Sequence, residues 1–122
     1  MASNRIWTSG PIPLTTTLTT NLLNPPVVSG GVNAGSAPHF IIVRHMSVLN
    51  KTNAAATCSF YRGATAGNVA GTEVFGIGLS VPPNWFIERN GVWRFDLADF
   101  LVGGAGTTTA LVLHLWGEIG LV

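Results

Sequence analysis

Apolar and polar positions alternate along several short segments of this chain, and a period of two is that of a half-buried β-strand. The segments that show it span residues 39–49, 54–61, 72–80 and 107–122. Glycine- or proline-rich stretches separate them at intervals of roughly 8 to 12 residues, which is typical of sandwiches and barrels. Leu14, Leu18 and Leu22 have helical spacing, but the threonines among them favour an exposed or edge strand over residues 14–23. The pattern therefore predicts an all-β fold.

Residues 85–102 contain the clearest turn signal in the chain. Asn90-Gly91 separates two runs rich in aromatic and β-branched residues, and this dipeptide readily adopts the positive φ angles of a type I′ turn. A two-residue turn fixes the register of a hairpin, so we expect Arg89 to face Val92 and Phe86 to face Phe95. This register sorts the side chains into one face with Phe86, Trp93 and Phe95 and another with Trp85, Ile87, Arg89, Arg94 and Asp96.

Residues 39–49 are largely apolar on both faces, as in a central strand that is covered on each side. We place its even face toward the core, which comprises Phe40, Ile42, Arg44, Met46 and Val48. Arg44 then needs a carboxylate partner, because an unpaired buried charge costs several kcal/mol. Glu118 and Glu73 are the candidates.

The other alternating segments complete the predicted sandwich. Residues 54–61 point Ala56, Cys58 and Phe60 inward and form a second hairpin with the preceding strand. Residues 72–80 form a strand with Phe75, Ile77 and Leu79 inward, and residues 103–106 form a loop. Residues 107–122 form a long central strand with a bulge or bend at Gly117. We predict an antiparallel β-sandwich, jelly-roll-like, of seven to eight strands.

The chain is long enough for one domain, which we assign to residues 14–122. Residues 1–13 show no periodicity and carry two lone apolar anchors, Ile6 and Trp7. This segment is either a loose tail or an extended N-terminal arm that orders only across a neighbouring subunit. The tryptophan favours the arm.

The composition points to a protein that works by contact. Charged residues make up 9% of the 122 residues, against a typical ~25%, and the mean hydropathy is +0.41. We therefore expect some apolar surface to meet a partner. Six scattered basic residues and a net charge of +1 argue against nucleic-acid binding. No run reaches the ~18 apolar residues of a membrane span, and the first ten residues lack a signal-peptide core. These patterns predict a soluble protein, made in the cytoplasm, without a membrane partner.

The residue types that carry chemistry do not form a recognisable motif. Cys58 is the single cysteine, and His39, His45 and His114 lack the spacing of a metal site. The carboxylates are better explained by ion pairs and turns, no serine lies in a nucleophile elbow, and the glycine-rich stretch 63–71 lacks a phosphate-binding signature. We expect no metal, no cofactor and no catalytic residues, and hence no enzymatic activity.

Three stretches resemble small virion proteins of tailed bacteriophages: VRHMSVLNKTNAAATCSFYRGATAGNVAGTEVFG, SVPPNWF and DLADFLVGGAGTTTALVLHLWGEIG. The similarity spans residues 43–120, with an N-K-T turn, a G-A-T loop and a D-F-L-V-G-G-A turn as its motifs. It implies a capsid decoration (cement) protein, commonly a homotrimer, that binds the major capsid protein on the virion surface after synthesis in the host cytoplasm. Such small sandwiches also occur in phage necks and tails, so a tail or neck component is the alternative.

The candidate partner-binding residues are Ile6, Trp7, Trp85, Arg89, Arg94 and Trp116. Tryptophan is enriched at interface hot spots, although Trp85 and Trp116 would equally suit a core. A third class of function, a carbohydrate-binding sandwich, would use Trp85, Trp93 or Trp116 as a sugar platform.

Overall fold

A computed structural model describes residues 3–23, 40–96, 99–107 and 109–121. The described residues form nine strands and no helix. The strands are β1 (Ser3–Thr8), β2 (Ile12–Pro13), β3 (Asn21–Leu23), β4 (Phe40–Asn50), β5 (Ala56–Gly63), β6 (Leu79–Val81), β7 (Phe86–Asp96), β8 (Phe100–Ala105) and β9 (Leu111–Leu121). All strand pairs are antiparallel, which confirms the predicted all-β class.

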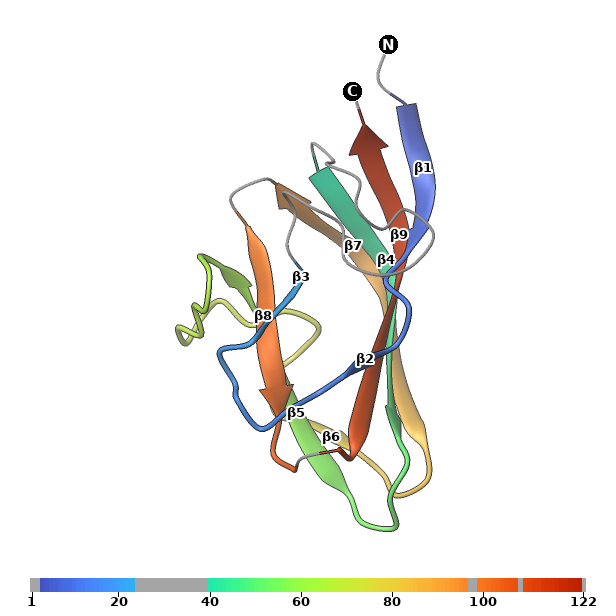
Figure 1. Ribbon diagram of the computed structural model, residues 1–122, viewed down its shortest axis with the longest axis vertical. Coiled ribbons are helices and arrows are strands. Elements are labelled where there is room, and N and C mark those ends of the chain that lie inside the picture. The colour runs from blue at the N-terminus through green and yellow to red at the C-terminus, as the bar shows by residue number, and fades with distance from the viewer. Residues whose placement is uncertain (1–2, 24–39, 97–98, 108, 122) are drawn as a thin grey trace.

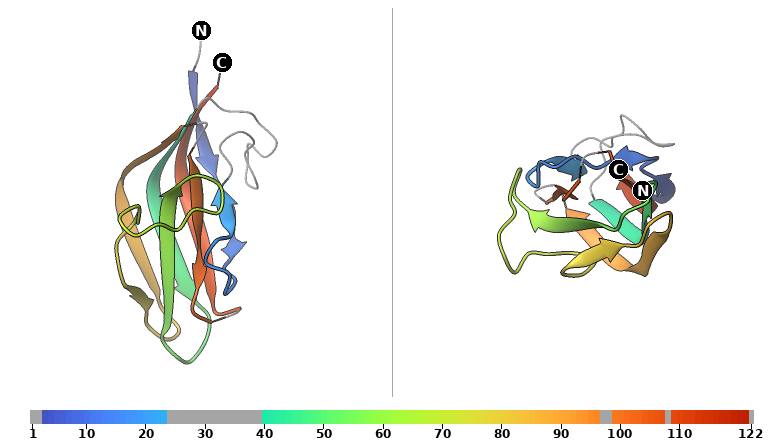
Figure 2. Two further views of the ribbon diagram at one scale, coloured as in Figure 1. Left: turned by 90° about the vertical axis from the view of Figure 1, so that its left-hand side faces the viewer. Right: turned by 90° about the horizontal axis from the view of Figure 1, so that it is seen from below.

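The strands form two sheets that pack against each other (Figure 1, Figure 2). The five-stranded sheet has the order β1-β9-β4-β7, with β2 also paired to β9, and the four-stranded sheet has the order β3-β8-β5-β6. Side chains from both sheets make one hydrophobic cluster between them. The molecule is therefore an antiparallel β-sandwich.

The strand pairing is nested along the chain. β1 and β2 pair with the last strand β9, β3 pairs with β8, β4 with β7, and β5 with β6. The pairs β4–β9 and β5–β8 then join these ribbons into sheets. The chain is thus one long hairpin rolled into two layers, and both termini lie together at one end (Figure 1).

The inward faces of two strands agree with their alternation in the sequence. In β9, the alternating residues Leu111, Leu113, Leu115 and Ile119 are buried, and the strand is central, as predicted, between β1 and β4. In β5, the predicted set Ala56, Cys58 and Phe60 is buried. Regular alternation was sufficient for these two strands because each keeps its pleat along the buried segment.

A bulge at Arg44 changes the inward face of β4. Val43 pairs with Gly117 and His45 with the adjacent Trp116, so Arg44 is an extra residue. Ile41 and Val43 are buried before it and Met46 and Val48 after it. The predicted even face is therefore wrong for the first half of the strand and right for the second. Arg44 is exposed and pairs with Glu118, one of its two expected partners, at the surface.

The predicted hairpin at Asn90-Gly91 is wrong. β7 continues unbroken through both residues along β4, and neither residue has a positive φ. Pairing with β4 satisfies one edge of β7 over its whole length, and the Asn-Gly pair becomes part of a register shift opposite Arg44. Trp93 and Phe95 do face inward, but Phe86 is exposed and Ile87 packs against the core.

Three further predictions fail where the chain changes sheet or bends. β4 and β5 belong to different sheets, so the turn at residues 51–55 joins two layers and closes no hairpin. Only residues 79 and 80 of the predicted strand 72–80 lie in a strand, β6, and Ile77 is exposed. Residues 103–105 do not form the predicted loop but belong to β8. Glycine suits position 103 in this strand, because a Cβ atom there would lie 2.1 Å from Ser59 O on the neighbouring strand β5.

The predicted N-terminal arm is a pair of strands in the protein's own sheet. Ser3–Thr8 pairs with β9 along its whole length, and Ile12–Pro13 continues along the same strand. Trp7 is fully buried in the core cluster, which explains a tryptophan in an otherwise unpatterned segment. The boundary expected at residue 13 is therefore not a structural one.

Among the described residues, no helix has the length and apolarity that crossing a bilayer requires.

Candidate protein-binding face

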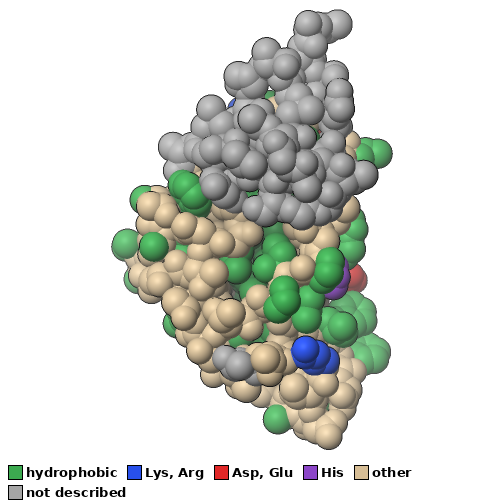
Figure 3. All heavy atoms as spheres, viewed as in Figure 1, with side chains coloured by type: hydrophobic (Ala, Val, Ile, Leu, Met, Phe, Trp, Pro, Cys, Tyr) green, Lys and Arg blue, Asp and Glu red, His purple; other side chains and the backbone are tan. Residues whose placement is uncertain are grey.

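The outer face of the five-stranded sheet carries the exposed aromatic side chains. This face, called the outer face below, is built by rows of residues paired across β9, β4 and β7. One row is Val112, Leu49 and Phe86, the next is His114, Ser47 and Glu88, and the third is Trp116, His45 and Asn90. All nine are exposed or half-buried, while most of their sequence neighbours in β4 and β9 are buried. Figure 3 shows hydrophobic side chains along the right-hand margin, beside a histidine and an acidic residue.

Trp116 is the centre of a polar-aromatic group, here called the central cluster, with His45, His114, Glu88 and Asn90. The His45 ring is 5.1 Å from the Trp116 ring, and the His114 ring stacks on it at 5.6 Å. His45 Nδ1 lies 2.7 Å from Asn90 Oδ1, and its Nε2 lies 3.4 Å from Glu88 Oε2. Trp116 is still 40% exposed. The cluster holds an accessible indole in a fixed orientation.

A second aromatic group, here called the end platform, comprises Trp85, Phe86, Leu49 and Val112. The Trp85 and Phe86 rings stack at 5.4 Å with 22° between their planes. Trp85 is 60% exposed, and Phe86 and Leu49 are also exposed. Val112, Leu49 and Phe86 form one apolar row across three strands. Val112 lies four residues from Trp116 on β9, about 14 Å at ~3.4 Å per residue. The platform directly adjoins the row of His114, Ser47 and Glu88, two of which belong to the central cluster.

The two arginines of the outer face are paired with carboxylates within it. Arg44 pairs with Glu118, Arg94 Nε lies 2.9 Å from Asp96 Oδ1, and Glu88 contacts His45. The Arg94 guanidinium also lies 4.2 Å over the Phe40 ring. A face that is paired in this way suits a partner through shape and apolar contact more than through net charge.

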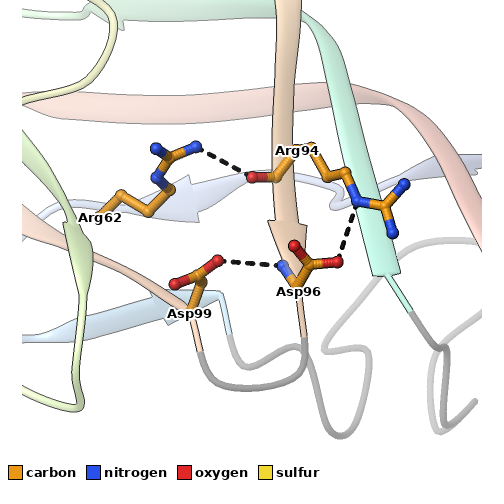
Figure 4. A network of polar contacts seen from close by, with 4 residues as sticks. All are labelled: Arg62, Arg94, Asp96 and Asp99. Atoms are coloured by element: carbon orange, nitrogen blue, oxygen red, sulfur yellow. Dashed lines mark hydrogen bonds and ion pairs between the residues drawn. The ribbon is translucent and has the colours of Figure 1, made fainter.

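Arg94 also takes part in a network that links the two sheets (Figure 4). Arg62 Nη1, on β5, donates to Arg94 O on β7, and Asp96 N donates to Asp99 Oδ2. Asp99 lies just before β8. These contacts explain Asp96 by pairing and Asp99 by the turn that it stabilises, as the sequence predicted.

The structure separates the six predicted partner-binding residues. Ile6 (85% exposed), Trp85 and Trp116 are accessible, whereas Trp7 is buried and cannot contact a partner in this conformation. Arg89 and Arg94 are exposed on the edge strand β7, and Arg89 Nη1 donates to Glu88 O.

Phe86, Leu49 and Val92 are exposed apolar residues that the sequence reasoning missed. The supposed hairpin register placed Phe86 inward. Leu49 lies on the odd face of β4, which the sequence analysis placed outward, but its place beside Phe86 and Val112 depends on strand pairing that the alternation of β4 does not specify.

The side chains that could bind a metal or act as a nucleophile do not gather into one site among the described residues. Among the described residues, no three His, Cys, Asp or Glu side chains gather as a metal site. Cys58 is buried, and burial raises the pKa of its thiol to about 12 although the positive charge of Arg89 acts in the opposite direction. A cavity of about 330 Å³ between β2 and β3 is lined by Ser9, Pro11, Ile12, Pro13, Thr20, Asn21 and Leu22, which include no titratable side chain. His39 lies outside the described residues.

A scan against models of protein families found no match for the chain, and a search of curated proteins found no relative.

Proposed function

We propose that this protein is a structural component of a tailed-phage virion, a decoration (cement) protein that binds the assembled major capsid protein on the head surface. The resemblance of residues 43–120 to phage virion proteins supports this proposal. The strand pairing supports it as well. If β1 and β2 are counted as one strand, the sheet orders become 1-8-3-6 and 2-7-4-5, those of a jelly roll. Jelly rolls occur in viral capsid and lectin domains.

The observation that carries the proposal is the accessible Trp116 at the centre of an uncovered, charge-paired sheet face. Large apolar surfaces on a folded domain mark interaction sites, and buried tryptophans contribute most to binding energy at interfaces. The central cluster pre-orients the indole, which lowers the entropy lost on binding. Ile6, which pairs with Glu118 of β9 and is 85% exposed, extends the same face onto β1, so the partner contact centres on Trp116 and reaches Ile6.

A protein that binds only the assembled lattice stabilises it by mass action. Such a role needs surface complementarity and no chemistry, in line with the sequence expectation of no catalytic residue, metal or cofactor. Assembly as a homotrimer would place three such faces on a symmetric site and raise the avidity.

The test is co-sedimentation of the purified protein with expanded capsids that lack it. We expect the protein to bind and to raise the capsid melting temperature. Trp116→Ala, at an exposed position that the fold does not need, lowers the affinity about tenfold or more. Ile77→Ala, at an exposed apolar side chain on a loop away from the outer face, is the control and leaves binding unchanged.

Absence of capsid binding, or unchanged binding of Trp116→Ala, would overturn the proposal. A virion map that places the protein at the neck or tail would establish the alternative location in its stead.

A further inference from the structure

We infer that the end platform is a binding site for an uncharged carbohydrate, in which Trp85 carries a pyranose ring. This inference concerns the end of the outer face next to the central cluster, and it goes beyond capsid decoration. Figure 1 places the loop between β6 and β7, which leads into the platform, at the end of the sandwich opposite the termini.

The first argument is that the platform is held rigidly although it is exposed. Asn84 adopts a positive φ of 52° immediately before Trp85, and the Trp85 ring then stacks on that of Phe86. Successive residues of a regular strand point to opposite faces, so the stacking of the two rings shows that Trp85 lies outside the regular pleat of β7, which begins at Phe86. A non-glycine residue in the left-handed region is uncommon and carries a cost that the surroundings must offset.

The surroundings that hold Trp85 are centred on Asn50, a buried polar residue. Asn50 N donates to Trp85 O at 2.8 Å, so the tryptophan backbone is fixed to the end of β4. Asn50 Nδ2 donates to Ala54 O and Val81 O, and Asn50 Oδ1 accepts from Thr52 N and Oγ1. Asn84 N also donates to Thr52 O. The two loops are therefore locked together, and the exposed ring is presented in one position before any ligand arrives.

The second argument concerns the chemistry of the ligand. One face of a pyranose ring presents C–H groups that pack on an aromatic plane, and its edge presents hydroxyl groups that need hydrogen-bond partners. The platform offers the stacked pair Trp85–Phe86 as the plane. Asn84, which directly precedes Trp85, donates from Nδ2 to Asn53 Oδ1 at 2.9 Å, so two amide side chains are joined in the neighbouring loops. Amide groups both donate and accept, as hydroxyl recognition requires.

The charge around the platform favours a neutral sugar. Lys51 is the only charged residue in the segments 50–54 and 81–86, and the platform residues are all uncharged. In the adjacent row, Glu88 contacts His45. An anionic ligand would need several cations at the site. A purely apolar peptide would form no hydrogen bond with the side-chain amides of Asn84 and Asn53.

The test is an array of neutral oligosaccharides built from glucose, galactose, mannose and N-acetylglucosamine, with sialylated and sulfated glycans as charged counterparts. The strongest neutral binder is then titrated into the free protein by calorimetry and tryptophan fluorescence. We expect selective binding of a neutral glycan. We also expect a fluorescence change that disappears in Trp85→Ala together with a loss of affinity of about tenfold or more.

Trp85→Phe retains an aromatic plane and keeps part of the affinity, and the control Ile77→Ala keeps all of it. Circular dichroism verifies that each variant is folded. Absence of any neutral glycan binder, preference for charged glycans, or unchanged affinity in Trp85→Ala would each refute the inference. Because no capsid is present in this experiment, its failure leaves the decoration proposal standing, and failure of capsid binding leaves this result standing.

Discussion

At the scale of single residues, Gly117 is the position where the fold tolerates least change. It lies in the central strand β9 opposite the bulge of β4, and a Cβ atom there would lie 1.9 Å from Ile42 O. That oxygen belongs to the backbone and cannot rotate away. We predict that Gly117→Ala lowers the free energy of unfolding by about 3 kcal/mol, as expected for overpacking against a fixed backbone.

The matched control is Gly63→Ala, since Gly63 also lies in a strand but a Cβ atom there would meet no atom of a non-adjacent residue within 4 Å. Its unfolding free energy should stay within about 0.5 kcal/mol of the original. Urea denaturation of the three proteins measures both values. Equal stability of the two variants would show that β4 and β9 can separate at the bulge without loss.

Sequence reasoning at this scale succeeded where alternation is unbroken and failed at local irregularities. The inward residues of β5 and β9 follow directly from their pattern. Arg44 inverts the pattern of β4, and Trp85, just before β7, stacks on the next residue Phe86 and does not point to the opposite face. Both irregularities depend on the neighbouring strand or loop, so neither is encoded in the residue's own surroundings in sequence.

At the scale of elements, the edge strand β7 is protected against pairing with another chain. It has a neighbour on one side only, and its register shift opposite Arg44 interrupts a flat edge. Arg89 pairs with the buried Met46 and so lies on the core-facing side of β7, yet its side chain is exposed. Bulges and inward-pointing charges are the devices by which sheets avoid edge-to-edge association. This protection agrees with the proposal that a partner binds the outer face and not the edge of β7.

Substitutions in β1 distinguish a strand that stabilises its own domain from an arm that is exchanged between subunits. Trp7→Ala removes a fully buried side chain, so it should lower the free energy of unfolding by about 3–5 kcal/mol in the monomer. Ile6→Ala on the same strand, at a side chain 85% exposed, should change it by less than about 0.5 kcal/mol. Thermal and urea unfolding at low protein concentration provide the measurement. A Trp7→Ala protein of unaltered monomer stability that no longer self-associates would instead indicate an exchanged arm.

At the scale of the whole molecule, the sequence indicated two packed sheets but not how the chain is rolled. Strand pairs were assigned to neighbours in sequence, such as residues 39–49 with 54–61, because turn signals are local. In the structure, the strand pairs are nested along the chain. The innermost pair is β5–β6 and the outermost is β1–β9. Residues as distant as Ser3 and Leu121 are paired, and no local signal specifies such a contact.

This nesting predicts slow folding. The central strand β9 lies last in the chain but has β1 on one side and β4 on the other, so neither the β1–β9 pair nor the β4–β9 pair can form before the C-terminal residues join the sheet. The loop-closure entropy of these distant pairs must be spent before their contacts form, and folds with such topology refold in milliseconds to seconds. Stopped-flow refolding from urea, after an unfolding pulse too brief for prolyl isomerisation, should show a main phase in that range.

Gly117→Ala should also slow refolding if the β4–β9 contact is part of the transition state. A main phase in microseconds would mean that local pairs such as β5–β6 suffice to direct the fold, and the long-range ribbon would then be a consequence of folding and not its limiting step.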